Sequence, residues 1–130
     1  MDTKVEIIKK DLINLEVSPN LKNYEETYQN FSWDKIKEEI AFFPDGKINA
    51  AYNAIDKHLD TPVMQKLALV WENDEGKIQK FTFAEMAELS NKVANVLKNL
   101  SVQKGDRVFL FLPRIPELYY SFLGVLKTGA

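Results

Sequence analysis

The sequence contains one histidine, His58, which is a candidate for a catalytic or metal-binding role. An imidazole can act as a general base or bind a metal ion near neutral pH. The chain has no cysteine and no second histidine to complete a metal site, and no serine lies in a nucleophile-elbow pattern. His58 also falls near the end of an expected helix, where a cation interacts favourably with the helix dipole. We therefore interpret His58 as a structural residue at a helix end.

Arg114 and an acidic loop are the other places where ligand chemistry could occur. Arg114 follows the apolar run at residues 108–112, and ligands of open α/β sheets collect at the carboxyl ends of strands. The loop at residues 73–77 carries oxygen atoms that suit calcium, but it lacks the twelve-residue ligand spacing and the closing bidentate glutamate. We therefore interpret Arg114 as a solvated strand-end residue and the loop as a polar turn.

A phosphate cradle requires a flexible loop in which glycine is combined with serine, threonine and lysine. The chain has five glycines, and no two of them share a loop of that kind: Gly46, Gly76, Gly105, Gly124 and Gly129. The sequence therefore offers no candidate for holding a nucleotide phosphate. We predict no catalytic, cofactor-binding or metal-binding residue among these 130 residues.

The elements that would position any site begin with a hairpin and a helix. Residues 67–72 and 78–81 predict a β-hairpin around the glycine-containing loop. Thr82 and Glu85 have the spacing of a capping box, so a helix should begin at Thr82 and end near Asn99. One face of this helix has the spacing of a buried stripe: Phe83, Met86, Ala87, Ser90, Val93, Ala94 and Leu97.

A second strand and a second helix are expected after this helix. The unbroken apolar run at residues 108–112 is typical of a strand that is buried on both faces of a parallel sheet. Pro116 suits the first turn of a helix, and Gly129 is a suitable left-handed stop. On this helix we expect an apolar face and a polar stripe that contains Gly124; the apolar face consists of Leu118, Phe122, Val125 and Leu126. The order strand, helix, strand, helix predicts a βαβα unit in a mostly parallel sheet.

The N-terminal part, residues 1–47, is rich in aromatic residues, and we interpret it as an arm that extends from the rest of the protein. Residues 1–20 fit a helix face and a strand equally well, and two short helices are expected at residues 24–30 and 33–39, the second capped by Ser32. The rings could form a ligand-stacking platform, but rings that anchor an arm to a larger body are the interpretation that we favour.

A turn at residues 44–46 separates this arm from the rest of the chain. A helix capped by Asn49 should then run over residues 49–59. We therefore divide the chain into an arm at residues 1–47 and an α/β domain at residues 48–130, which is truncated at its C-terminal end.

Composition limits the function classes. The formal net charge of −2 argues against nucleic acid as the main partner. No apolar run approaches the length that spans a bilayer, and the N-terminus lacks the apolar core of a secretion signal. The absence of cysteine fits a reducing compartment. We expect an α/β protein of the cytoplasm that binds neither nucleic acid nor membrane.

Several strings of the chain resemble the adenylate-forming superfamily, which includes the AMP-forming acyl-CoA synthetases. Residues 81–86, FTFAEM, resemble its first core motif, an aromatic-Thr-aromatic-x-Glu-aliphatic string, and residues 126–130, LKTGA, resemble the opening of its second. Residues 20–33, NLKNYEETYQNFSW, and 48–58, INAAYNAIDKH, are similar to acetate–CoA ligases of the bacterial type, although Lys57 stands where arginine is more usual. The resemblance covers roughly residues 21–130, almost the whole chain.

This resemblance implies an N-terminal fragment, truncated at its C-terminal end, of the large domain of an acetate–CoA ligase. Such a parent enzyme activates acetate with ATP to acetyl-adenylate, releases pyrophosphate, and transfers the acetyl group to CoA with release of AMP. Mg²⁺ would neutralise the triphosphate. The superfamily's phosphate loop, nucleotide-binding segments and catalytic lysine would all lie after residue 130. We therefore expect the fragment alone to be inactive, to bind no cofactor, and to have the rest of the enzyme as its partner.

Two alternatives stay open at this stage. Residues 67–130 would look similar in a medium-chain acyl-CoA synthetase or in a peptide-synthetase adenylation domain. A non-catalytic interaction module that holds a partner with its aromatic arm is the third reading. The sequence that follows residue 130 in the reading frame would distinguish all three.

Overall fold

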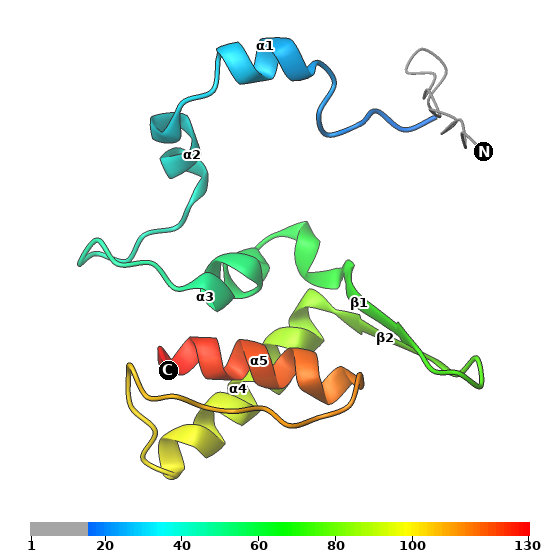
Figure 1. Cartoon of the computed structure of the whole chain (residues 1–130), viewed down its shortest axis with the longest axis vertical. Helices are drawn as coiled ribbons and strands as arrows, with labels where there is room; N and C mark the ends of the chain where they lie inside the picture. The colour runs from blue at the N-terminus through cyan, green and yellow to red at the C-terminus, as the bar shows by residue number, and fades with distance from the viewer. Residues whose placement is uncertain (1–15) are drawn as a thin grey trace, which may run out of the picture. The chain divides into compact units, whose positions relative to one another are not determined.

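The computed structural model describes residues 16–130 (Figure 1). The helix or strand considered for residues 1–20 thus falls almost entirely outside the described residues. The chain divides into two compact units, Met1–Ile36 and Lys37–Ala130. Our division between residues 47 and 48 stays a prediction.

Two short helices, α1 (Tyr24–Gln29) and α2 (Trp33–Glu39), follow the beginning of the described chain, as expected. Local hydrogen bonds start both. The Asn23 side chain accepts from the Glu26 N–H at 3.3 Å, and Ser32 Oγ accepts from the Asp34 N–H at 3.3 Å. Neither helix contains a buried residue, so caps rather than a core define their positions in the sequence.

The second unit holds the hairpin and the longer helices. Its elements are α3 (Ala50–Ala54), the 3₁₀ turns η1 (Asp56–His58) and η2 (Pro62–Gln65), β1 (Leu67–Glu72), β2 (Ile78–Thr82), α4 (Phe83–Asn99) and α5 (Pro116–Thr128). This order confirms the expected α/β fold class, with a helical arm followed by a β-hairpin.

The hairpin is an antiparallel pair in which Val70 lies opposite Lys80. Its loop is organised by Asn73, whose Oδ1 accepts from the N–H of Glu75 at 3.2 Å and of Lys77 at 2.7 Å. An Asx-type side chain that bonds to the backbone in this way closes a turn without further ligands. The interpretation of this acidic loop as a polar turn is confirmed.

Helix α4 begins at the expected capping box. Thr82 Oγ1 accepts from the Glu85 N–H at 3.2 Å, and Glu85 Oε2 accepts from the Thr82 N–H at 2.7 Å. The face of α4 that is buried matches the expected stripe and comprises Met86, Ala87, Ser90 and Ala94. Ser90 satisfies its buried hydroxyl by donating to the Met86 carbonyl at 2.6 Å.

Helix α5 lies across α4 (Figure 1), and Gly124 lies in the contact between them. A Cβ at Gly124 would lie 2.7 Å from Val93 Cβ and 2.9 Å from the Ser90 carbonyl oxygen. The expectation that Gly124 belongs to a polar stripe was therefore wrong: it lies in the helix–helix contact. Phe122, expected to face the core, is 55% exposed.

The helix expected at residues 49–59 is shorter than predicted. Asn49 does cap it, since Asn49 Oδ1 accepts from the Tyr52 N–H at 3.1 Å. The α-helix ends at Ala54, because Ile55 has φ −127° and ψ −62°, and the chain continues as the tighter turn η1. This change of direction lets the Ile55 side chain join Met86 and Ala87 in the core.

The strand expected at residues 108–112 is not formed within the described chain. The sheet contains β1 and β2 only, and residues 107–113 run without strand pairing. Nor is the run buried on both faces, because Phe109 is 90% and Phe111 is 101% exposed. A strand requires a neighbour that accepts and donates its backbone hydrogen bonds, and residues 16–130 supply none here.

The capping box gives a first prediction. Thr82→Ala should lower the free energy of unfolding by about 0.5–2 kcal/mol, the usual loss for a capping hydroxyl. Urea denaturation of the chain measures it. The Thr82 backbone N–H, and then its hydroxyl, hold the pKa of Glu85 below its ordinary 4.5, so this contact stabilises the fold fully above that pH. Its contribution is lost as the pH falls through the lowered pKa.

An NMR titration provides the control for this prediction. In the Thr82→Ala variant the backbone N–H remains, so the Glu85 pKa should rise only part of the way to 4.5. An unchanged unfolding free energy together with an unchanged Glu85 pKa would contradict the capping role.

The helix contact gives a second prediction. Gly124→Ala should destabilise the chain by about 1–3 kcal/mol, because overpacking outweighs the roughly 1 kcal/mol that alanine gains over glycine in a helix. Adding Val93→Ala should recover only part of the loss, because it removes the Cγ1 contact at 2.7 Å but leaves the Val93 Cβ at 2.7 Å and the Ser90 carbonyl at 2.9 Å. A Gly124→Ala variant at least as stable as the parent chain would show that α4 and α5 are further apart than described.

Candidate functional site

His58 lies at the end of η1, as a helix-terminal residue should. Its ring meets the Phe83 ring edge to face, with centroids 5.3 Å apart and planes at 72°. Its carbonyl oxygen accepts from Thr61 Oγ1 at 2.8 Å, which helps to close the turn before η2. Both contacts are structural, and the helix-end position agrees with the sequence analysis; the absence of a catalytic role stays a prediction.

Arg114 is exposed, in the corner that precedes α5. Its backbone is engaged, because the Arg114 carbonyl accepts from Trp71 Nε1 at 2.7 Å. This bond ties the corner to β1. Among residues 16–130 there is no group of three or more histidine, aspartate or glutamate side chains that could hold a metal ion.

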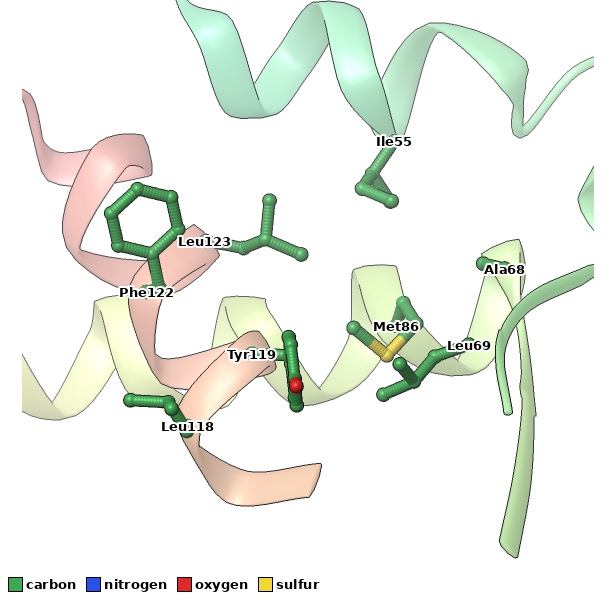
Figure 2. Close-up of a pocket in the computed structure, with 8 residues that line it drawn as sticks. All are labelled: Ile55, Ala68, Leu69, Met86, Leu118, Tyr119, Phe122 and Leu123. Carbon is green, nitrogen blue, oxygen red and sulfur yellow. The ribbon is translucent and has the colours of Figure 1, made fainter. Parts of the chain in front are cut away.

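An apolar groove of about 540 Å³ lies in the second unit. Figure 2 shows Leu123 and Ile55 reaching into the same space from α5 and from the end of α3. The groove is lined by Ile55, Ala68, Leu69, Met86, Leu118, Tyr119, Phe122 and Leu123. The Tyr119 hydroxyl is the one polar group among the side chains drawn in Figure 2. Such a surface can bury hydrocarbon, but it offers nothing to hold a phosphate or polarise a carboxylate.

A polar cluster lies beside the core, formed by Lys127, Asp56 and Asn91. Lys127 Nζ is 2.7 Å from Asp56 Oδ1 and donates to Asn91 Oδ1 at 2.8 Å. The Lys127 side chain is only 9% exposed, and Nζ also lies 3.4 Å from the Ala87 carbonyl oxygen. All three donors of the ammonium group therefore have partners, so the cluster connects α5 to η1 and α4 and leaves no free charge for chemistry.

Asn49 strengthens the same junction. While its Oδ1 caps α3, its Nδ2 donates to the Leu126 carbonyl at 2.7 Å. Carbonyls in the last turn of a helix have no partner within the helix, and Asn49 supplies one. The start of α3 and the end of α5 are therefore held together by a single side chain.

The sequence analysis singled out neither Lys127 nor Asp56. The usable signal was spacing: Lys127 lies seven residues after Tyr120 and three residues after Gly124, so it shares their helix face. A lysine on the face that packs against α4 requires a carboxylate partner.

Near the start of α5, burial and the neighbouring Glu117 raise the pKa of Tyr120.

Comparison with known proteins gives consistent results. The profile of a family described as "AMP-binding enzyme" matches residues 55–130. An acetyl-coenzyme A synthetase from Bacillus subtilis is 48% identical over 122 residues, which are 93% of this chain and 21% of that protein. Another acetyl-coenzyme A synthetase, from Leptospira biflexa, is 42% identical over 98 residues, which are 75% of this chain and 15% of that protein.

A solved structure shares the fold. The crystal structure of an acyl-CoA synthetase from Brucella canis matches with a TM-score of 0.73 and 29% identity, over 82% of this chain and 19% of that one. The chain thus spans about a fifth or less of the length of these relatives.

The polar cluster gives a third prediction. Lys127→Met should destabilise the chain by about 3 kcal/mol, the lower end of the range for a broken buried pair, because the Asp56 side chain is 19% exposed. Urea denaturation measures the loss.

An exposed lysine provides the matched control. Lys92 pairs with Glu88 at 2.7 Å on the surface of α4, where both side chains are about two-thirds exposed. Lys92→Met should cost about 0.5 kcal/mol or less. Equal losses in the two variants would contradict the assignment of Lys127 as a buried clamp.

Proposed function

The chain belongs to the AMP-binding enzyme family, and on this premise we propose that it is the N-terminal part of an AMP-forming acetate–CoA ligase. In the proposed reaction acetate attacks the α-phosphorus of ATP, which forms acetyl-adenylate and releases pyrophosphate. The CoA thiol then attacks the acetyl carbonyl, forms the thioester and releases AMP.

The observation that carries this proposal is the extent of the similarity to the Bacillus subtilis protein. The family profile begins only at residue 55. The similarity to that acetyl-coenzyme A synthetase covers 122 of the 130 residues, so it includes most of the N-terminal arm. Because the similarity extends beyond the residues that the family profile matches, it favours the acetate-specific class.

The role of this chain within such an enzyme is structural. Charge stabilisation at phosphorus requires backbone amides or cations aimed at the phosphate oxygens. The glycines with positive φ at residues 46, 76 and 105 lie in open turns, Gly124 is in a helix contact, and Gly129 ends α5. We therefore assign no catalytic residue to this chain and place the binding of ATP and CoA in the remainder of the enzyme.

Magnesium would neutralise the ATP triphosphate in this reaction. Among residues 16–130 no group of three or more histidine, aspartate or glutamate side chains comes together, and Mg²⁺ in nucleotide sites is usually bound by the substrate phosphates with one or two carboxylates. The metal would therefore be bound elsewhere in the parent enzyme.

The alternatives raised by the sequence are not favoured. A medium-chain acyl-CoA synthetase or a peptide-synthetase domain would share the elements from β1 onward, but the similarity to acetyl-coenzyme A synthetases extends through the arm. A non-catalytic interaction module has no support from the family match. No helix within residues 16–130 is long and apolar enough to cross a membrane. We propose the cytoplasm as the site of action, where acetate, ATP and CoA are available together.

Pyrophosphate exchange tests this proposal. The 130-residue chain should show no acetate-dependent exchange between ATP and pyrophosphate, whereas the protein encoded by the full reading frame should show it. Acetate should be activated with a kcat/KM higher than that for octanoate. A full-length protein that activates octanoate in preference to acetate would contradict the acetate assignment, and exchange by the 130-residue chain itself would contradict its structural role.

A further inference from the structure

Residues 39–43, which we call the strap, lead from the last residue of α2 to the turn at residues 44–46. After Glu39 the strap has no regular secondary structure, so its backbone groups depend on partners outside a helix or a sheet. The strap belongs to the second unit, as α3 and η1 do. Its contacts with these two elements therefore lie within one compact body.

A single side chain binds both backbone groups of Ala41. Asn53 Oδ1 accepts from the Ala41 N–H at 2.8 Å, and Asn53 Nδ2 donates to the Ala41 carbonyl at 3.0 Å. Asn53 Nδ2 also donates to the Asn49 carbonyl at 3.2 Å, which fixes the orientation of the amide on α3. A side-chain amide has one acceptor atom and two donor hydrogens. Asn53 thus offers Ala41 the same two groups that the backbone of a neighbouring strand would offer.

Two further contacts hold the strap on either side of Ala41. Lys57 Nζ donates to the Glu39 carbonyl at 3.1 Å and so supplies a partner and a positive charge at the last turn of α2. The Phe43 ring packs against the Tyr52 ring, with centroids 5.2 Å apart. The strap is therefore attached to α3 and η1 at every second residue.

The turn that follows the strap is closed by its own hydrogen bonds. The Phe43 N–H donates to the Lys47 carbonyl at 2.8 Å, and the Gly46 N–H donates to the Phe43 carbonyl at 2.8 Å. Asn49, the cap of α3, comes two residues after this turn closes. The connection from the strap to α3 is thus short and hydrogen-bonded.

We propose that Asn53 and Lys57 form a backbone clamp that fastens the strap to α3 and η1, so that residues 39–47 move with the α/β unit and only the chain before Glu39 can change its position. The hydrogen bonds of the clamp reach backbone atoms of the strap, so they select the path of the chain and not a particular side chain. This proposal moves the start of the α/β unit from residue 48 to about residue 39. It concerns contacts within this chain and is independent of the proposed function.

Hydrogen–deuterium exchange on the 130-residue chain tests the clamp. In Asn53→Leu the protection factor of the Ala41 amide should fall about 10-fold, because this amide loses its acceptor. Ala41→Ser is the matched control and should keep the protection, since the clamp binds only the backbone at this position. Amides of α4 serve as the internal reference. An Ala41 amide that is equally protected with and without the Asn53 side chain would overturn the proposal.

NMR relaxation tests whether the strap moves with the α/β unit. Backbone order parameters of residues 39–43 should be about 0.85, the value of rigid backbone, and should fall below about 0.6 in the double variant Asn53→Leu, Lys57→Met. A strap that is already flexible in the unsubstituted chain would overturn the proposal, and so would a strap that stays rigid in the double variant.

Lys57 alone provides the test should Asn53→Leu fail to fold, because its side chain is partly exposed and its loss leaves the core intact. The order parameter of Glu39 should fall in Lys57→Met and return in Lys57→Arg, whose guanidinium can donate to the same carbonyl. Equal order parameters at Glu39 in the unsubstituted chain and in Lys57→Met would overturn the assignment of Lys57 to the clamp.

Discussion

The close approach of α4 and α5 at Gly124 is the contact on which the second unit depends. The backbone of α5 at Gly124 packs directly against the Val93 side chain of α4, so that a Cβ added at Gly124 would lie 2.7 Å from Val93. Such tight packing buries the small residues of both helices only while the helices keep this position. Ser90 occupies the same contact and is fully buried, and its hydroxyl is satisfied within α4. The hairpin, η1 and the end of α3 then pack around this pair rather than around a sheet.

The buried ammonium group of Lys127 adds specificity to that contact. Removing an ammonium ion from water is costly, and the cost is offset only where the group meets an opposite charge and satisfies its donors. Asp56, Asn91 and the Ala87 carbonyl do so from η1 and α4. A shift of α5 by one turn would leave the charge buried without these partners. The cluster therefore selects one register of the helix packing among several that apolar contacts alone would tolerate.

The two family motifs acquire a physical content in this structure. The first, at residues 81–86, is a device that starts α4: a threonine cap, a reciprocal glutamate, and apolar residues that enter the core. The second, at residues 126–130, ends α5: Lys127 clamps the helix, and Gly129 closes it at φ +80°. In the described chain, both motifs therefore act on the ends of helices.

The sequence by itself determined the features whose energies are local. The cap at Asn49, the capping box at Thr82, the polar turn at residues 73–77 and the glycine stop at Gly129 each involve residues within about four positions of one another, so their patterns are visible in the sequence. The position of His58 at a helix end followed from the same local logic.

Only the tertiary structure decided where Gly124 and Lys127 lie and what becomes of residues 108–112. The partners of Gly124 and Lys127 stand 31 to 71 residues away in the sequence, and helical periodicity cannot tell a small residue on a wet face from one in a helix contact. A strand is defined by a neighbour's backbone, and that neighbour lies outside the pattern of the strand itself. An apolar run therefore predicts the capacity of residues 108–112 to pair, whereas the pairing depends on a partner that the described chain does not contain.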